Sequence, residues 1–129
     1  MKWPIKEVAG VLLVVAVLFF IGSWAGAAEV GEMDLAKVMP DDVKVLVDND
    51  RVRVLDVTHK PGVKEPMHSH PAYVSVNLSD TKVKVTTPNG KTVEKVRKAG
   101  EVSWSEATTH AIETVGTDGS HTIVIELKK

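Results

Sequence analysis

The sequence contains no cysteine among its 129 residues. This absence excludes disulfide bonds, a thiolate nucleophile and thiolate metal ligands. Any metal ion bound by this chain must therefore be held by nitrogen and oxygen atoms. A large excess of one charge is also missing, because 16 basic and 17 acidic residues give a net charge of −1. A near-neutral chain offers no electrostatic case for binding nucleic acid or an anionic membrane surface.

The sequence has only one long apolar run, and it lies near the N-terminus. Residues 8–24 carry no charge, follow two lysines and precede the small residues "AGAA". This arrangement predicts a secretory signal peptide at residues 1–27, cleaved after Ala27 or after Ala28, and a periplasmic or secreted protein. The alternative is an uncleaved membrane anchor facing the periplasm, although the run is slightly shorter than the ~18–20 residues that span a bilayer comfortably.

The rest of the chain lacks an amphipathic helix of three turns, a repeat and a low-complexity tract. Residues 28–42 are of mixed polarity and are expected to form an N-terminal arm. Short alternating runs separated by Gly, Pro, Asn and Asp then fill residues 43–129. The expected strands cover residues 43–50, 51–60, 73–80, 82–87, 91–96, 101–107, 110–115 and 121–127. Asn89-Gly90 between two such runs predicts a hairpin, and the whole pattern predicts an all-β antiparallel sandwich or barrel.

Histidines stand at the start of three of the alternating runs. In "HSHPAYV", "HAIET" and "HTIVIEL", most of the residues at every second position after the histidine are apolar. Because side chains alternate between the two faces of a strand, this phase predicts that Val74 and Val76 face the core with His68 and His70. It also predicts that Ser75 faces away. The close pair, His68 and His70, either holds a metal ion or is a polar break at the start of a strand.

Two spacings in the chain resemble the motifs of the cupin superfamily, and in particular its small single-domain members. Gly62 is followed after five residues by His68 and His70, and Gly100 precedes His110 by ten positions. The resemblance covers nearly the whole chain after the arm, and it implies a cupin-type antiparallel β-barrel of two jelly-roll-like sheets at residues 43–129.

The chain departs from the cupin motifs at several positions. Val74 and Ser75 stand where the first motif has its glutamate. Glu106 and Thr108 replace the proline and glycine of the second motif, its histidine comes one residue early, and Thr114 replaces its asparagine. The resemblance therefore implies a ligand set of histidines without the usual carboxylate.

The site implied by the resemblance is a mononuclear divalent metal held by His68, His70 and His110. Imidazole suits iron, copper, nickel and zinc. Three neutral ligands leave coordination positions open and the ion's charge unneutralised, which favours a small anionic molecule. Within the cupins, an iron site of histidines alone resembles the site of the thiol dioxygenases, so the resemblance implies a dioxygenase-like reaction as one expectation. No catalytic residue is assigned, and no organic cofactor is expected. The alternative is a metal-free periplasmic ligand-binding or interaction module; in either case cupin barrels often pair, which implies a homodimer.

Several further residues are candidates for the wall of the pocket. His121 could be a fourth ligand, or only a half-buried histidine at a strand end. Met67 could assist copper, or simply pack. Glu65 and Glu106 could act as acid, base or replacement ligand, although their predicted loop positions favour solvation. His59, beside a turn, is expected to face solvent. The additional pocket candidates are thus His121, Met67, Tyr73, Trp104 and Glu106.

Overall fold

Nine strands and one short helix make up the part of the chain that the computed structural model describes, residues 33–129. The predicted signal peptide lies outside these residues. The elements are α1 (Leu35–Val38), β1 (Val43–Asp48), β2 (Val52–His59), β3 (Lys64–His70), β4 (Tyr73–Asn77), β5 (Thr81–Thr86), β6 (Thr92–Arg97), β7 (Val102–Ser105), β8 (Thr108–Val115) and β9 (Ser120–Leu127). Within residues 33–129, no helix is both long and apolar enough to cross a membrane.

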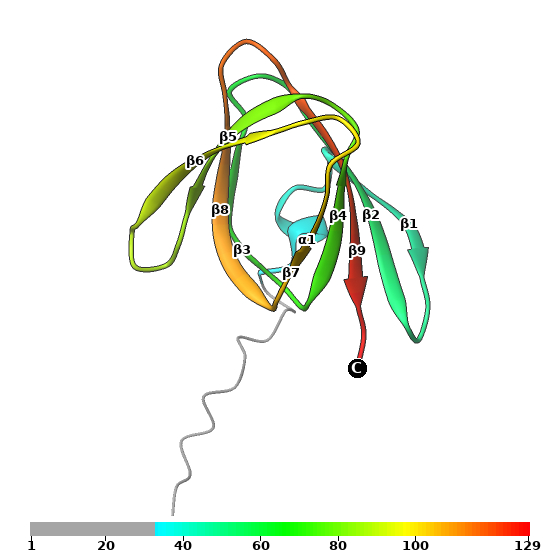
Figure 1. The fold of residues 1–129 in the computed structure, drawn as a ribbon. Helices are drawn as coiled ribbons and strands as arrows, with labels where there is room; N and C mark the ends of the chain where they lie inside the picture. Colours follow the sequence, from blue (N-terminus) through cyan, green and yellow to red (C-terminus); the bar gives the residue numbers. More distant parts are fainter. Residues whose placement is uncertain (1–32) are drawn as a thin grey trace, which may run out of the picture.

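The strands form two antiparallel sheets that face each other (Figure 1). One sheet has five strands in the order β1-β2-β9-β4-β7, and the other has four in the order β3-β8-β5-β6. The predicted all-β, two-sheet antiparallel architecture is confirmed. All eight expected runs form strands, and Asn89-Gly90 lies in the connection between β5 and β6, where Gly90 has a φ of 84° that L-residues rarely adopt.

The ninth strand, β3, was hidden in the sequence because its pattern is irregular. Its register with β8 shifts between Glu65 and His68, so that three steps along β3 match two steps along β8. This shift is a β-bulge around Pro66, a residue that tolerates the bulge because it has no backbone N–H to pair. The extra residue interrupts the alternation on which strand prediction depends.

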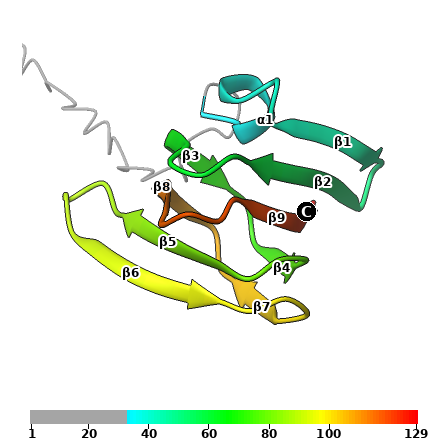
Figure 2. The ribbon, with the colours of Figure 1, turned by 90° about the horizontal axis from the view of Figure 1, so that it is seen from above.

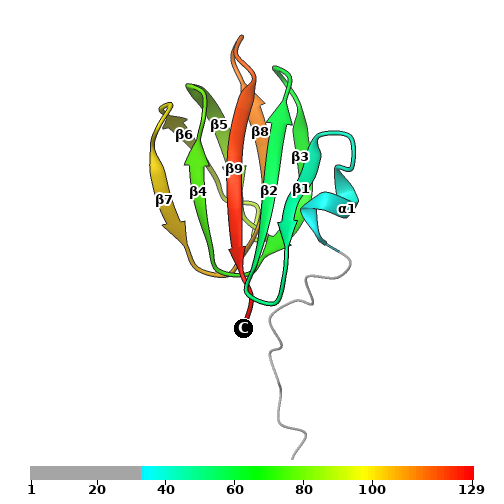
Figure 3. The ribbon, with the colours of Figure 1, turned by 90° about the vertical axis from the view of Figure 1, so that its right-hand side faces the viewer.

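The N-terminal arm includes α1, which lies beside β1 and β3 at one side of the barrel (Figures 2 and 3). The side chain of Asp34 caps the helix by accepting a hydrogen bond from the backbone N–H of Ala36 at 3.0 Å. Leu35 is 2% exposed and packs into the main apolar core. The backbone N–H of Ser69 donates to the carbonyl of Met33 at 2.8 Å, so the arm also covers the edge of β3.

The direction of the side chains differs from the prediction in two strands. In β8, His110, Ile112 and Thr114 face the interior, as expected. In β4, however, the buried residues are Ser75 and Asn77, so the prediction for this strand was wrong. The turn after His70 resets the alternation between β3 and β4.

The side chains of β9 also face the opposite way from the prediction. His121, Ile123 and Ile125 occupy every second position, and this set was expected to face the core. The buried residues are instead Thr122, Val124 and Glu126. Val124 packs in the core, whereas Ile123, Ile125 and Leu127 are only half-buried and lie on the other face of the strand. The apolar residues predicted the wrong face because the inner face of β9 carries two polar residues, Thr122 and Glu126.

Candidate metal centre

The pairing of β3 with β8 brings the three predicted metal ligands together. His68 lies directly opposite His110 in the register, and His70 follows two residues later on the same face. One ring nitrogen from each of the three residues lies within 4.8 Å of the others. The residues are 0%, 4% and 7% exposed for His68, His70 and His110. This arrangement is compact enough for a single ion to be held by all three.

Hydrogen bonds fix which nitrogen of each β3 histidine is available. The Nδ1 of His70 lies 2.7 Å from the Oε1 of Glu126, and the Nδ1 of His68 lies 2.8 Å from the carbonyl oxygen of Pro66. Both oxygens can only accept, so each Nδ1 carries the proton and each Nε2 keeps its lone pair. The Nε2 of His68 is buried without a hydrogen-bond partner. A buried lone pair of this kind fits a metal ligand oriented by its second nitrogen.

The site also favours neutral imidazoles, the form that binds metal. Burial, followed by repulsion from His68 and His70 and from Arg97 and Lys95 of β6, lowers the pKa of His110 to about 3. Burial likewise lowers the pKa of His68, although the nearby Glu65 carboxylate opposes this shift. These two histidines are therefore uncharged at neutral pH.

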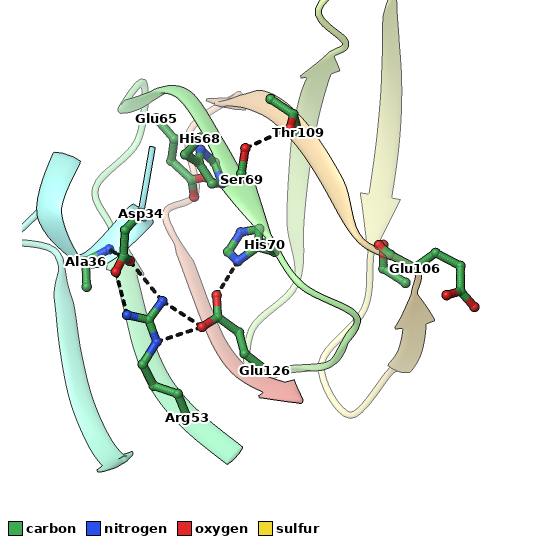
Figure 4. A network of polar contacts seen from close by, with 11 residues as sticks. Asp34, Ala36, Arg53, Glu65, His68, Ser69, His70, Glu106, Thr109 and Glu126 are labelled. Carbon is green, nitrogen blue, oxygen red and sulfur yellow. Dashed lines mark hydrogen bonds and ion pairs between the residues drawn. The ribbon is translucent and has the colours of Figure 1, made fainter. Parts of the chain in front are cut away.

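A buried ionic network supports His70 from the five-stranded sheet (Figure 4). Arg53 bonds both oxygens of Asp34, with its Nη1 2.6 Å from Oδ2, and its Nε donates to the Oε2 of Glu126 at 2.7 Å. Glu126 in turn accepts from His70. Desolvation would raise the pKa of Asp34, but the Arg53 guanidinium outweighs it and lowers that pKa. We call Asp34, Arg53 and Glu126 the arginine network.

A second buried network leads to His68. His59 is 4% exposed, so its predicted solvent-facing position was wrong. Its Nδ1 lies 3.0 Å from Asp42 Oδ2, and its Nε2 lies 2.6 Å from Glu65 Oε1. Burial lowers the pKa of His59, but bonds to the two carboxylates outweigh burial and raise it above the ordinary value. We call Asp42, His59 and Glu65 the histidine network.

Two spaces are lined by histidines of this cluster. An interior cavity of ≈ 40 Å³ is lined by His70, His110, Tyr73 and Arg97, among others. A cleft of ≈ 890 Å³ lies against the barrel end near the C-terminus, and it is also lined by His70. The interior cavity suits an ion or a water molecule, whereas the cleft has the size of a small-molecule site. His70 stands between the two.

The five additional pocket candidates lie in different places. The ring centroid of Tyr73 lies 4.8 Å from that of His70, so Tyr73 joins the site. Met67 lies in the β3 bulge and is half-buried. The side chain of His121 is 41% exposed, bonds Asp56 and is outside the cluster of His68, His70 and His110.

The remaining two candidates, Trp104 and Glu106, do not join the histidines. Trp104 is 55% exposed and donates its indole N–H to the exposed Glu106 at 2.8 Å. Glu106 also borders the cleft, and Figure 4 shows it well away from His68.

Sequence reasoning did not find the two networks, although they hold the site histidines in place. Arg53 in "VRVLDV" and Glu126 in "TIVIEL" are charged residues within largely apolar runs. A charge in such a run signals a buried partner, because an unpaired charge in a core is costly. The partners themselves, Asp34 and Glu126, lie 92 residues apart in sequence, and only the fold shows that they meet.

No protein-family model matches the sequence, and no curated protein matches it. Solved structures do resemble the fold. A cupin domain from Bordetella pertussis Tohama I is 26% identical, with a TM-score of 0.63 over 67% of this chain and 92% of that chain. A cupin superfamily protein from Desulfitobacterium hafniense is 17% identical, with a TM-score of 0.52 over 67% and 76% of the two chains. An RmlC-like cupin family protein with a double-stranded β-helix fold, from Methanocaldococcus jannaschii, is 14% identical, with a TM-score of 0.55 over 67% and 78%.

Proposed function

Since these likenesses support the cupin superfamily and confirm the predicted cupin-type barrel, we propose that the chain holds one divalent transition-metal ion on His68, His70 and His110. The ion would serve to bind or transform a small anionic molecule. The observation that carries this proposal is the buried Nε2 of His68, which has no hydrogen-bond partner among the described residues. Leaving such a group unsatisfied costs about 1–3 kcal/mol, and a bound cation would remove that cost.

The chain's own residues would hold and orient the ion's ligands. Glu126 fixes the ring of His70 through Nδ1, and the Pro66 carbonyl fixes the ring of His68. Iron, copper, nickel and zinc all accept imidazole ligands, and a bound ion of this kind supplies Lewis acidity or redox activity. Tyr73 lies against His70 and restricts the space beside it.

The preference for an anion rests on the electrostatics of the interior. Arg97 lines the cavity with His70 and His110, and repulsion from Arg97 and Lys95 contributes to the lowered pKa of His110. Within the described residues, no hydrogen bond or ion pair of the Arg97 side chain is present. A free guanidinium at the cavity suits a carboxylate or a similar planar anion. The resemblance to all-histidine iron cupins favours oxygenation as the reaction class.

Metal analysis of the protein, purified without a metal-binding tag, tests this proposal. We expect close to one iron, copper, nickel or zinc ion per chain in the wild type, and loss of most of it in His68→Ala and His110→Ala. His121→Ala is the matched control, because it removes a histidine outside the centre and should keep the metal. Retention of metal by both ligand variants, or its absence from wild type even after ions are added, would contradict the proposal.

A second candidate function is a metal-free ligand-binding module. The observation that favours it is the cleft of ≈ 890 Å³ beside His70, which is large enough for a ligand to bind without any metal chemistry. Binding of small carboxylates to chelated and metal-loaded protein distinguishes the two. Equal affinity in both forms supports the module, whereas binding only to the loaded form supports the metal site.

Export and self-association are further parts of the proposal. We propose that the mature protein works in the periplasm or outside the cell, released at Ala27 or Ala28, and that two copies pair. The intact mass of protein recovered from a periplasmic fraction tests the cleavage, and light scattering during size-exclusion chromatography tests the pairing. A full-length mass in the membrane fraction would support the anchor instead.

A further inference from the structure

Glu65 is a buried carboxylate beside the three histidines, and its contacts are incomplete. It is 6% exposed, and its Oε1 bonds His59 at 2.6 Å. Its Oε2 is buried and has no hydrogen-bond partner among the described residues. The nearest site atom is the Nε2 of His68 at 3.3 Å, and this nitrogen also has no partner. Figure 4 shows the two side chains next to each other.

The two unpartnered atoms cannot satisfy each other. His68 uses its Nδ1 proton for the carbonyl of Pro66, so its Nε2 carries only a lone pair. The Oε2 of Glu65 is also an acceptor, and Oε1 is already bonded to His59. Two buried acceptors that face each other repel unless a cation or a proton lies between them. A metal ion would serve both.

The spacing of the two atoms also agrees with ligands of one ion. With bonds of about 2.0–2.2 Å, neighbouring ligand atoms of a tetrahedral or octahedral site lie about 3.0–3.5 Å apart. The observed separation between Glu65 Oε2 and His68 Nε2 is 3.3 Å. In addition, Glu65 lines the same interior cavity as His70 and His110.

The bulge in β3 explains why Glu65 reaches the histidines. Residues three apart on a regular strand point to opposite faces. The register shift places Glu65 opposite Ile112, a buried residue of β8, while His68 remains opposite His110. Both side chains therefore face the interior, and bulges commonly re-aim side chains in this way next to sites.

The position that usually supplies the carboxylate is closed to it in this chain. Val74 points to the outer face, and the inward Ser75 bonds the hydroxyl of Ser103 at 2.8 Å. Any carboxylate at the centre must come from elsewhere, and Glu65 lies on the other sheet, N-terminal to the histidine pair rather than C-terminal to it.

We propose that the Oε2 of Glu65 is a fourth protein ligand to the ion held by His68, His70 and His110. This inference rests on the proposed metal site and deepens it. The carboxylate would reduce the net charge of the loaded centre from two to one. It would also make the site better suited to iron, whose protein sites often combine imidazoles with a carboxylate.

The test compares Glu65→Gln with Glu126→Gln, since both residues are buried carboxylates that contact a site histidine. Zinc affinity is measured by competition with a chelator, and the visible absorption of the Co(II)-loaded proteins reports the atoms bound to the ion. We expect Glu65→Gln to lose more than ~100-fold in affinity and to change the Co(II) spectrum. Loss of a residue that only orients a ligand costs about 10–100-fold, so Glu126→Gln should fall in that range with its spectrum kept.

Three results separate the possible failures. If wild type binds neither zinc nor cobalt, the metal site itself is wrong. If wild type binds them and Glu65→Gln matches Glu126→Gln in affinity and spectrum, the metal site stands and the role of Glu65 is overturned. If Glu65→Gln fails to fold, a crystal structure of zinc-loaded wild type decides, because a ligand Oε2 lies about 2.0–2.2 Å from the ion and a non-ligand does not.

Discussion

The two histidines of β3 stand two residues apart, yet each lies at the end of a network of a different kind. The arginine network joins Asp34 and Glu126 through Arg53 and ends at His70. The histidine network joins Asp42 and Glu65 through His59 and reaches His68. In both, a basic residue of β2 lies between an acidic residue of the N-terminal arm and a glutamate beside the three histidines.

The difference lies in what remains unsatisfied. Both oxygens of Glu126 are bonded, one to Arg53 and one to His70. Only one oxygen of Glu65 is bonded, and the other faces His68 without a hydrogen bond. A closed network fixes a ligand, whereas an open one leaves an acceptor for an incoming cation. The comparison teaches that the same kind of buried charge pair can be closed at one histidine and left open at the next.

Removing the cation of the arginine network should have the largest effect on stability. Arg53→Met leaves the carboxylates of Asp34 and Glu126 buried without their partner, and breaking such a pair costs about 3–5 kcal/mol. Urea denaturation of the metal-free protein measures the loss. Arg51→Met, at an exposed arginine two residues earlier, should change the free energy of unfolding by less than ~0.5 kcal/mol. Equal effects of the two substitutions would show that the network does not hold the fold.

Removing the cation of the histidine network should cost less, and the cost should depend on pH. His59→Gln replaces charged hydrogen bonds worth about 1.5–3 kcal/mol each, and part of their value survives in the amide. Because the folded pKa of His59 is raised, the stabilisation is complete below the unfolded pKa of about 6.5 and is lost as pH rises through the folded pKa.

Urea denaturation of metal-free wild type and His59→Gln between pH 6 and pH 9 checks this dependence. The difference in unfolding free energy should shrink as pH rises. The corresponding difference for Arg53→Met should stay constant, because a guanidinium keeps its charge over this range. A constant difference for His59→Gln would mean that its imidazole is uncharged between the two carboxylates.

The smallest predicted difference in stability is between variants of the two acidic residues of the N-terminal arm, Asp34 and Asp42. Asp34→Asn removes a nearly buried charge from Arg53 but keeps a good helix cap, so we expect a loss of about 1–2 kcal/mol. The side chain of Asp42 is 29% exposed, and Asp42→Asn should cost less than ~1 kcal/mol. Thermal unfolding of the two variants side by side measures the order. A larger loss of stability in Asp42→Asn than in Asp34→Asn would show that burial does not determine how much each acidic residue stabilises the fold.

Much of the fold could be predicted from the sequence, because alternation and turn residues are local signals. Asn89-Gly90 and the eight alternating runs identified their strands, and the resemblance to the cupin motifs implied the class of barrel. The three histidines also meet as that resemblance implied. These features depend only on neighbouring residues or on a short motif.

The direction of side chains in β4 and β9 could not be predicted in this way. The turn at Pro71 breaks the phase between β3 and β4, and no local residue reports by how much. In β9, Ile123 and Ile125 lie on the outer face because Thr122 and Glu126 are needed inside. The pairing of Arg53 with Glu126 joins residues 73 positions apart, and His59 and Glu65 lie beside a turn and a bulge whose geometry the sequence does not report.

The bulge of β3 makes the composition of the centre depend on the length of a segment as well as on its residues. At the three-residue spacing from Glu65 to His68, only the bulge keeps both side chains inside, and a regular strand of the same length would turn Glu65 to the outside with every histidine unchanged. Related chains that share both histidines and the glutamate could thus differ in their chemistry through the presence or absence of this one extra residue in a bulge. When such chains are aligned, the number of residues between the glutamate and the first histidine carries information that residue identity alone does not.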